Sequence, residues 1–285
     1  MSDRARTRDP SEVSTESFPM PQRAALRFFR QVTRTTVGIF RDLGARVFFT
    51  LDVGRALGDV RTYAPLVVQQ MRNIGVDSVP LAAIVAAFIG AVTAYQTVYQ
   101  IFPGVQLSAV AWIVRQSVLL ELAPLLTALV LAGRVGARMT AEIGTMRVTE
   151  QVDALETLAY DPVAYLVVPR LLAALLMLPL LTVVADAVGL GSGFLTAVVA
   201  TRVTRVDFVE GLRLTFNTFQ VYYGIIKAAL FGGAIALVCT YEGYITGAGA
   251  EGVGRSTAKA VVITSVMILL LDALTALYLA PQLQS

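Results

Sequence analysis

The chain contains apolar runs that are long enough to cross a lipid bilayer. A transmembrane α-helix needs about 20 predominantly apolar residues, because the hydrocarbon core is about 30 Å thick. Five such stretches lie at residues 79–101, 107–132, 163–200, 221–241 and 260–280. Only 15% of the residues are charged and 56% are hydrophobic, whereas soluble domains carry about 25% charged residues. The sequence therefore predicts an all-α integral membrane protein with about five transmembrane helices.

The third apolar stretch, residues 163–200, is longer than one straight span needs. Pro169, Pro179 and a glycine cluster at 189–193 lie within it, and we expect these residues to bend or break the helix. Gly189 and Gly193 also form a G-x-x-x-G pattern. That pattern permits close helix contact, either within the chain or with a second copy.

The first 75 residues contain no apolar run long enough to span a bilayer. Residues 1–22 mix polar, charged and proline residues without periodicity, which predicts a disordered tail. Residues 23–75 carry an apolar stripe beside arginines, which predicts interfacial amphipathic helices or, alternatively, helices packed on the protein's own cytoplasmic face. The stripe consists of Val37, Phe40, Val47, Phe48 and Leu51. Residues 76–285 then form a single membrane domain.

The basic residues are distributed unevenly between the two sides of the predicted spans. Of the 23 Lys and Arg residues, 17 lie before the first span, in the central stretch or before the last span, and only Arg202, Arg205 and Arg213 lie on the opposite side. Loops rich in Lys and Arg remain in the cytoplasm. We therefore expect a cytoplasmic N-terminus and, after five spans, a C-terminus outside the membrane.

Composition argues against several kinds of site. The chain has no His, and its one cysteine, Cys239, lies within an apolar run. A His- or thiolate-based metal site and a disulfide framework are therefore excluded. The net charge of +3 is a weak sign of nucleic-acid binding, because the basic residues are concentrated near one end of the chain. We expect no metal, no cofactor and no nucleic acid bound to this chain.

A glycine-rich segment before the last span matches two nucleotide-binding motifs in sequence but lacks the structural context that they need. Residues 247–252 fit G-x-G-x-x-G, and residues 249–256 nearly fit a P-loop, with Arg255 in place of the required Lys. Both patterns need an α/β domain around them, whereas the flanks here predict membrane helices. We expect a flexible cytoplasmic loop over residues 243–259 and no ATP hydrolysis by this chain.

Residues 132–162 differ from their apolar surroundings, because they hold three arginines and five acidic residues. Apolar residues recur at helical spacing on one face, with Thr140 as a candidate N-cap and Pro162 as a candidate stop. The pattern predicts a charged amphipathic helix at a membrane surface. Such a helix is either a solvated loop or a docking element for a soluble partner. The apolar face comprises Val148, Val152, Leu155 and Ala159.

Ionisable residues within predicted spans are costly in lipid, on the order of 2.5–3.5 kcal/mol each at a helix centre on insertion scales. We expect them to pair, with Glu121 or Asp272 against Lys227 or Arg115. Such pairs either fix packing or form a charge network that rearranges during transport. The full set is Arg115, Glu121, Asp186, Lys227 and Asp272. At the end of the first span, Gln96 and Gln100 share one helix face and are candidates to line a cavity.

Several segments resemble the MlaE/YrbE permease family of ABC transporters. They are Glu121-Leu-Ala-Pro124, Ala132-Gly-Arg134, Thr140-Ala-Glu-Ile-Gly144, Thr149-Glu-Gln151, Asp161-Pro162 and Pro169-Arg170. The resemblance implies a bacterial inner-membrane permease that pairs with a second copy. It also implies two cytoplasmic ATPase subunits, which carry ATP and Mg, and an MCE-domain protein on the outer side. Such complexes move phospholipids or other lipids between the inner membrane and the outer envelope.

The resemblance also implies roles for particular residues. Residues 134–162 would be the coupling segment, with ATPase contacts made by Glu142, Met146, Arg147, Glu150, Val152 and Leu155. The lipid path would pass the mouth of the first span, at Gln96, Tyr99, Gln100 and Ile101. Apart from the resemblance, the cost of charges in lipid predicts a buried charge network of Glu121, Lys227 and Asp272. Two competing interpretations are a proton-coupled secondary transporter that uses these three charges, and a scaffold that transports nothing.

Overall fold

The computed structural model describes residues 41, 44–58, 60–102, 104–279 and 282. The chain divides into two units, residues 1–50 and 51–285. In the first unit, residues 44–50 are helical, with Val47 and Phe48 exposed. The predicted tail at 1–22 and residues 23–40 of the predicted interfacial region lie outside the described residues, so the interfacial role stays a prediction.

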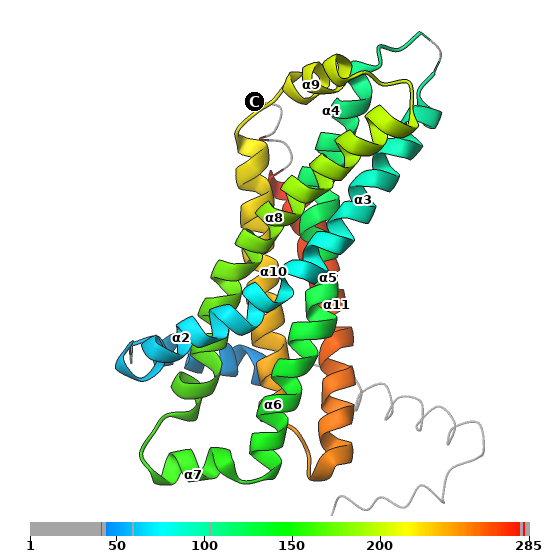
Figure 1. Cartoon of the computed structure of the whole chain (residues 1–285). Coiled ribbons are helices and arrows are strands. Elements are labelled where there is room, and N and C mark those ends of the chain that lie inside the picture. The colour runs from blue at the N-terminus through cyan, green and yellow to red at the C-terminus, as the bar shows by residue number, and fades with distance from the viewer. Residues whose placement is uncertain (1–40, 42–43, 59, 103, 280–281, 283–285) are drawn as a thin grey trace, which may run out of the picture. The chain divides into compact units, whose positions relative to one another are not determined.

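Regular structure in the described part of the second unit is entirely helical (Figure 1). A 3₁₀ turn, η2, spans Val76–Ser78, and π-helical turns occupy Val118–Leu122 (η3), Ala132–Gly136 (η4) and Val163–Val167 (η5). The α-helices are α2 (Val60–Ile74), α3 (Val79–Gln100), α4 (Ser108–Ser117), α5 (Ala123–Leu131), α6 (Ala137–Val148), α7 (Gln151–Thr157), α8 (Val168–Ala200), α9 (Arg205–Arg213), α10 (Phe219–Tyr244) and α11 (Gly249–Leu279).

Within the described residues, five helical segments are long and apolar enough to cross a membrane. Each matches one of the stretches predicted from the sequence to within one residue at the ends it does not extend, so the all-α fold class with five spans is confirmed. These segments are Tyr63–Gln100, Ser108–Val148, Val163–Ala200, Phe219–Tyr244 and Gly249–Leu279. Figure 1 shows α7, the end of α6 and the start of α11 at one end of this unit, and α9 at the other.

The second span continues without interruption into the central stretch. Helices α4, α5 and α6 are joined by the π-helical turns η3 and η4. Thr140 therefore lies inside α6, and its prediction as an N-cap is wrong. Its buried hydroxyl donates to the carbonyls of Gly136 (3.1 Å) and Cys239 (2.9 Å). Because one bond goes back along its own helix and the other to α10, the hydroxyl is satisfied without a helix terminus.

The predicted loop over residues 243–259 is also wrong, because α11 begins at Gly249 and only residues 245–248 lie between the last two helices. Gly249 has a φ of +80°, which suits glycine at this tight connection. Lys259 on α11 then pairs with the buried carboxylate of Glu242 on α10 at 3.0 Å. This pair joins the two helices on the side where the sequence predicted flexibility.

Helix α8 runs from Val168 to Ala200 without the predicted break. Pro169 falls in its first turn, where no backbone donor is needed, and Pro179 is accommodated inside the helix. The glycine pattern serves packing within the chain. A Cβ on Gly90 of α3 would lie 1.8 Å from the carbonyl oxygen of Gly189, and one on Gly193 would lie 3.1 Å from the carbonyl oxygen of Gly90. The absence of side chains therefore allows α3 and α8 to touch through their backbones.

The link between the third and fourth spans contains the short helix α9, which packs against α4. A Cβ on Gly211 would lie 2.0 Å from the carbonyl oxygen of Ser108, so the two helices are in backbone contact here. Phe208 is fully buried in a cluster with Val110, Ala111 and Val114 of α4. Part of the apolar surface of this link is therefore used to attach α9 to the second span.

Candidate functional site

Three predicted charges meet between the second, fourth and fifth spans. Lys227 of α10 is 0% exposed, and its Nζ lies 2.5 Å from Oε2 of Glu121 and 2.7 Å from Oδ1 of Asp272. The ring of Tyr223 lies on the same ammonium, with 5.1 Å from Nζ to the ring centroid. The sequence predicted that one acid would pair with Lys227 or Arg115, whereas in the structure both acids converge on Lys227.

Pro124 explains why the second span can bind the Lys227 ammonium near Leu120. In a regular α-helix the carbonyl of Leu120 would accept a bond from the backbone N–H of residue 124, but proline has none. The helix forms the π-helical turn η3 over Val118–Leu122 instead, and Nζ of Lys227 donates to the Leu120 carbonyl at 3.1 Å. The same turn carries Glu121, so one local irregularity supplies both a carbonyl and a carboxylate to the buried ammonium.

The charges of the cluster do not balance, because one ammonium faces two carboxylates. The side chain of Asp272 is 18% exposed and that of Glu121 is 43% exposed. Removing one partner of a buried pair leaves an uncompensated charge, which costs more than the pair itself contributes. Lys227 therefore ties three spans together, and Glu121 is the member most accessible from outside the chain.

The remaining predicted span charges lie elsewhere. Arg115 donates to the carbonyls of Leu212 (2.5 Å) and Leu214 (3.0 Å), and its guanidinium lies 5.4 Å from the centroid of the Phe216 ring. It holds the end of α9, and the predicted pairing with an acid does not occur. Oδ1 of Asp186 on α8 is buried without a hydrogen-bond partner among the described residues. The Arg115 contacts join residues about 100 positions apart, and no local pattern indicates them.

The central stretch does not form the single amphipathic helix predicted from its periodicity. Helix α6 ends at Val148, and Glu150 adopts a left-handed φ of 59° before the short helix α7. Ala159 has a φ of 61° and turns the chain back toward the third span. The two breaks prevent one continuous apolar face. Val152 is buried within the chain at 0% exposure, so it does not lie on an exposed face, and its predicted contact with an ATPase stays a prediction.

Other residues are exposed in its place. Leu158 is 69% exposed and Tyr160 is 50% exposed at the turn after α7. Leu155 and Met146 are half-buried, and Glu150 is exposed. Periodicity did not indicate Leu158, because it lies in the non-helical turn that Ala159 creates. The most exposed apolar side chains of this segment therefore lie at the turn at 158–160 rather than on the predicted helix face.

Glu142 and Arg147 are engaged within the chain. The Glu142 carboxylate accepts from Arg138 at 2.7 Å and from the buried Arg170 at 3.2 Å. The first bond lies within α6, and the second joins α6 to α8. Arg147 pairs with Asp153, and its guanidinium lies 5.7 Å from the ring centroid of Tyr244. These contacts fasten the base of the segment to the spans on both sides.

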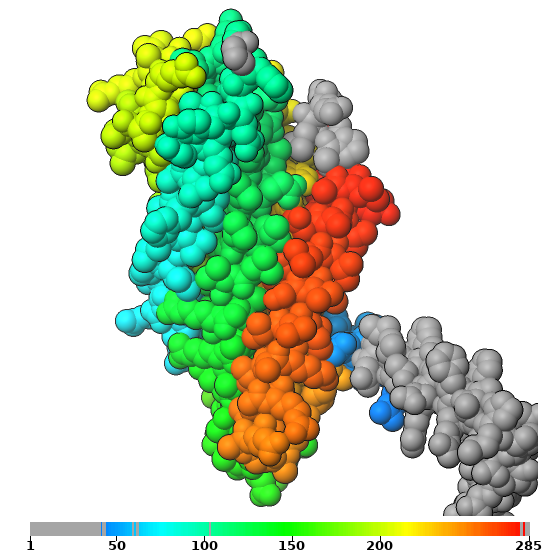
Figure 2. All heavy atoms as spheres, turned by 90° about the vertical axis from the view of Figure 1, so that its right-hand side faces the viewer, coloured from blue at the N-terminus to red at the C-terminus, as the bar shows by residue number. Residues whose placement is uncertain are grey.

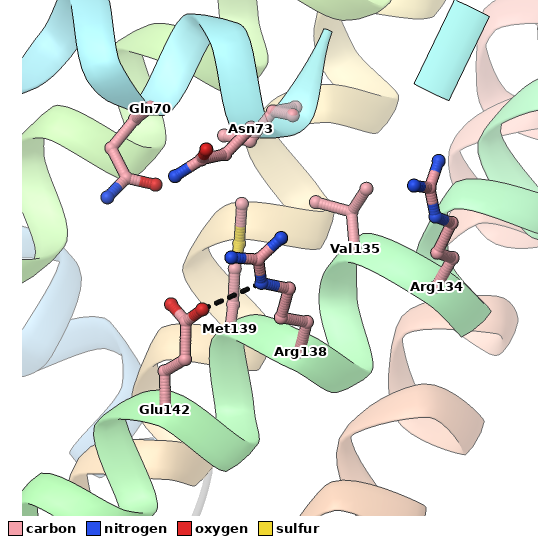
Figure 3. Close-up of a pocket in the computed structure, with 8 residues that line it drawn as sticks. Gln70, Asn73, Arg134, Val135, Arg138, Met139 and Glu142 are labelled. Atoms are coloured by element: carbon pink, nitrogen blue, oxygen red, sulfur yellow. Dashed lines mark hydrogen bonds and ion pairs between the residues drawn. The ribbon is translucent and has the colours of Figure 1, made fainter. Parts of the chain in front are cut away.

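A small polar cavity of about 20 Å³ lies beside this base, between α2 and α6. Figure 3 shows Gln70 and Asn73 of α2 facing Arg138 and Glu142 of α6, with Arg134 pointing elsewhere. Arg134 donates to the carbonyl of Asp77 (2.5 Å) and to the hydroxyl of Ser78 (3.2 Å). The charged residues thus hold α6 against the start of the first span, and the cavity is large enough only for about one water molecule.

The residues predicted for the lipid path lie on the surface of this chain at the end of α3. Gln96, Tyr99 and Gln100 are exposed and Ile101 is half-buried. The hydroxyls of Tyr95 and Tyr99 lie 3.2 Å apart. Figure 2 shows the first span, the second span and α11 on one face of the molecule. Large apolar side chains are exposed along two of these helices: Ile84, Phe88 and Val92 on α3, and Val262, Val266, Leu270, Leu274 and Leu277 on α11.

The chain matches the family described as Permease MlaE over residues 67–278. This chain belongs to that family. The match covers all five spans almost completely. The resemblance seen in the sequence is thereby confirmed.

Curated relatives support the same class. A "Probable ABC transporter permease protein" of Rickettsia bellii is 38% identical over 251 residues, which cover 86% of this permease and 95% of the relative. The "Intermembrane phospholipid transport system permease protein MlaE" of Haemophilus influenzae is 31% identical, over 87% of this permease and 95% of the relative. The chloroplastic protein TRIGALACTOSYLDIACYLGLYCEROL 1 of Arabidopsis thaliana is 31% identical, over 92% and 74%. This permease is thus an ABC transporter permease subunit and a multi-pass membrane protein.

Proposed function

We propose that this permease moves phospholipids or related lipids between the bacterial inner membrane and the outer envelope. It works as the membrane subunit of an ABC transporter, with ATP and Mg bound by a separate cytoplasmic ATPase and an MCE-domain protein on the outer side. The relative named for intermembrane phospholipid transport supports the substrate class. The orientation proposed has the N-terminus in the cytoplasm and the C-terminus in the periplasm.

The observation that carries the proposal is the segment between α6 and α8. It protrudes at the end of two spans and exposes Leu158 and Tyr160. Its base is fixed to the membrane helices by the Glu142–Arg170 pair. A force applied to α7 is therefore transmitted to the second and third spans rather than absorbed by a loose loop. This is the arrangement that a separate ATPase needs in order to move membrane helices.

The exposed apolar face on α3 and α11 supports two further parts of the proposal. Exposed apolar side chains of this kind are covered by lipid or by another protein. We infer that a second permease copy faces part of it and that lipid passes beside Gln96, Tyr99, Gln100 and Ile101. The Lys227 cluster borders this region through the accessible Glu121, where movement of α11 would alter the Asp272 contact.

The decisive experiment is purification of the tagged permease with its ATPase from native membranes. We expect Leu158→Asp to lower the ATPase-to-permease ratio strongly, because it places a charge in an apolar contact, and Glu150→Lys to lower it less. Val209→Asp, the same type of change at the opposite end, is the matched control and should leave the ratio unchanged. A ratio that is unaffected by Leu158→Asp in a folded permease would show that this segment does not bind the ATPase.

Energy coupling separates the proposal from a proton-coupled transporter. In proteoliposomes that hold the complete complex, lipid transfer should require ATP hydrolysis and should be insensitive to an imposed pH gradient. Transfer that follows the pH gradient without ATP would overturn the ABC mechanism and favour the secondary transporter.

Orientation is tested by thiol labelling in a Cys239→Ala background. Glu210→Cys should react with an impermeant reagent outside spheroplasts, and Leu158→Cys only after lysis.

A further inference from the structure

Helix α9 is rigidly held although it has only nine residues. At its start, Thr204 and Asp207 form a capping box, in which the Asp207 carboxylate accepts from the Thr204 hydroxyl (2.6 Å) and backbone N–H (3.0 Å). At its end, Arg115 binds the carbonyls of Leu212 and Leu214. The helix therefore presents a fixed surface rather than a flexible linker.

Only one face of α9 is used for packing against the chain. The opposite face exposes Val206 by 74% and Val209 by 43%. These valines line an open hollow of about 470 Å³ together with Arg205, Glu210 and Arg213. Just beyond the helix, Phe216 and Leu214 are also exposed. Apolar side chains bordered by arginines thus form a surface that the described chain leaves uncovered, and we call it the α9 outer face.

The position of Arg115 indicates how deep this face lies. Arg115 and Arg134 are both on the second span and are nineteen residues apart, which corresponds to about 28 Å of helix. That distance matches the hydrocarbon thickness of about 30 Å. From this spacing we infer that the two guanidinium groups lie at the two boundaries of the hydrocarbon core. Because Arg115 binds the end of α9 directly, α9 lies at one of these boundaries rather than far out in water.

The charged residues around the α9 outer face indicate which kind of molecule covers it. Arg202, Arg205 and Arg213 are exposed. Two acids lie nearby, and one of them, Asp207, is already engaged by Thr204. A helix at a membrane boundary that combines exposed apolar side chains with excess arginine favours anionic headgroups above apolar chains. We propose that the α9 outer face rests in the headgroup layer, with Val206 and Val209 in the acyl boundary and the three arginines on anionic phospholipid phosphates.

Accessibility of a spin label tests the depth of the α9 outer face. The full-length permease with Cys239→Ala carries the label at Val206→Cys or Val209→Cys and is placed in nanodiscs of phosphatidylcholine with phosphatidylglycerol. We expect both labels to be accessible to oxygen and shielded from a water-soluble nickel chelate. Leu158→Cys, an exposed apolar position at the other end, is the control and should show the reverse. Labels on α9 that are as accessible to the chelate as the Leu158 label would overturn the proposal.

Two further experiments distinguish anionic lipid from a second permease copy as the molecule that covers the α9 outer face. Raising the phosphatidylglycerol fraction should move the spin label at position 206 deeper into the bilayer. The variant Arg202→Gln/Arg205→Gln/Arg213→Gln should abolish this response. An undiminished response in that variant would overturn the role of the arginines. Mixing labelled with unlabelled permease should leave the spectrum unchanged. Line narrowing on dilution would show that a second copy covers this face, and it would overturn the lipid assignment.

The unmodified protein offers an independent readout. The one tryptophan of the chain, Trp112 on α4, donates from Nε1 to the Thr215 hydroxyl at 2.8 Å and is thus fixed beside the end of α9. Brominated lipids quench tryptophan fluorescence at the depth of the bromine. We expect quenching to be strongest when bromine lies near the headgroup end of the acyl chain. Strongest quenching by bromine near the chain terminus, or no quenching, would overturn the depth assigned to α9.

Discussion

The ammonium of Lys227 occupies the place opposite the Leu120 carbonyl that a backbone N–H would take in a regular helix. Pro124 leaves that carbonyl without its intrahelical donor. The buried lysine thus satisfies a backbone acceptor of the second span as well as the carboxylates of Glu121 and Asp272. Its substitution removes three interactions that join three spans.

The first prediction concerns the balance of this cluster. Lys227→Met should destabilise the folded permease by about 3 kcal/mol, because it leaves the largely buried carboxylate of Asp272 and the partly exposed one of Glu121 without a cation. Adding Glu121→Gln and Asp272→Asn should recover part of that stability, since the acids no longer need compensation. Thermal unfolding in one detergent measures both variants. A triple variant that is no more stable than Lys227→Met would show that charge imbalance is not the cause.

The second prediction concerns the base of the coupling segment. Glu142→Gln leaves Arg170, whose side chain is 7% exposed, without its carboxylate. We expect a loss of about 3 kcal/mol in unfolding free energy. Glu251→Gln is the matched control, because it breaks a fully exposed pair with Arg255 that contributes only about 0–1 kcal/mol. Comparable effects of the two substitutions would argue against a buried pair between α6 and α8.

The third prediction concerns the contact of α3 with α8. Gly90→Ala places a Cβ in overlap with the backbone of Gly189, and we expect a loss of at least about 1–3 kcal/mol through forced separation of the helices. Gly191→Ala is the control, because its Cβ meets no atom within 4 Å. That variant should be neutral or more stable by about 0.5–1 kcal/mol, through helix propensity alone. Equal melting temperatures for both variants would refute the close approach.

The fourth prediction concerns pH and the start of α9. The Thr204 hydroxyl, and then its backbone N–H, hold the pKa of Asp207 below its usual value. A carboxyl whose pKa is lower in the folded state contributes stability that is present above its unfolded pKa, about 3.9, and is lost as pH falls through the folded pKa. Mobility of a spin label at Glu210→Cys should therefore stay constant from neutral pH to about pH 4 and rise at lower pH. Asp207→Asn should remove this step, and an unchanged step in that variant would assign it to another group.

The local sequence pattern was sufficient to predict the membrane helices, because the formation of such a helix depends mainly on the residues within it. A run of about 20 apolar residues is unfavourable in water, and a single such segment in lipid satisfies all its own backbone hydrogen bonds only as a helix. The five predicted stretches were therefore found in place. Periodicity failed at 149–160, where the left-handed Glu150 and Ala159 divide one pattern into two segments. Glycine content misled at 249–259, where the chain is helical and Lys259 pairs with Glu242 of α10.

The sequence by itself determined the fold class, the number of spans and which ionisable residues lie within the spans, since these follow from the cost of placing apolar residues in water and from the length that a span needs. Only the tertiary structure decided which charges meet. Lys227 takes both acids, Arg115 turns to the carbonyls of α9, and Glu142 joins Arg170 across 28 positions. The physical reason is that these partners lie on different helices. Their distances depend on helix rotation and on close contacts such as Gly90 with Gly189, which no single segment encodes alone.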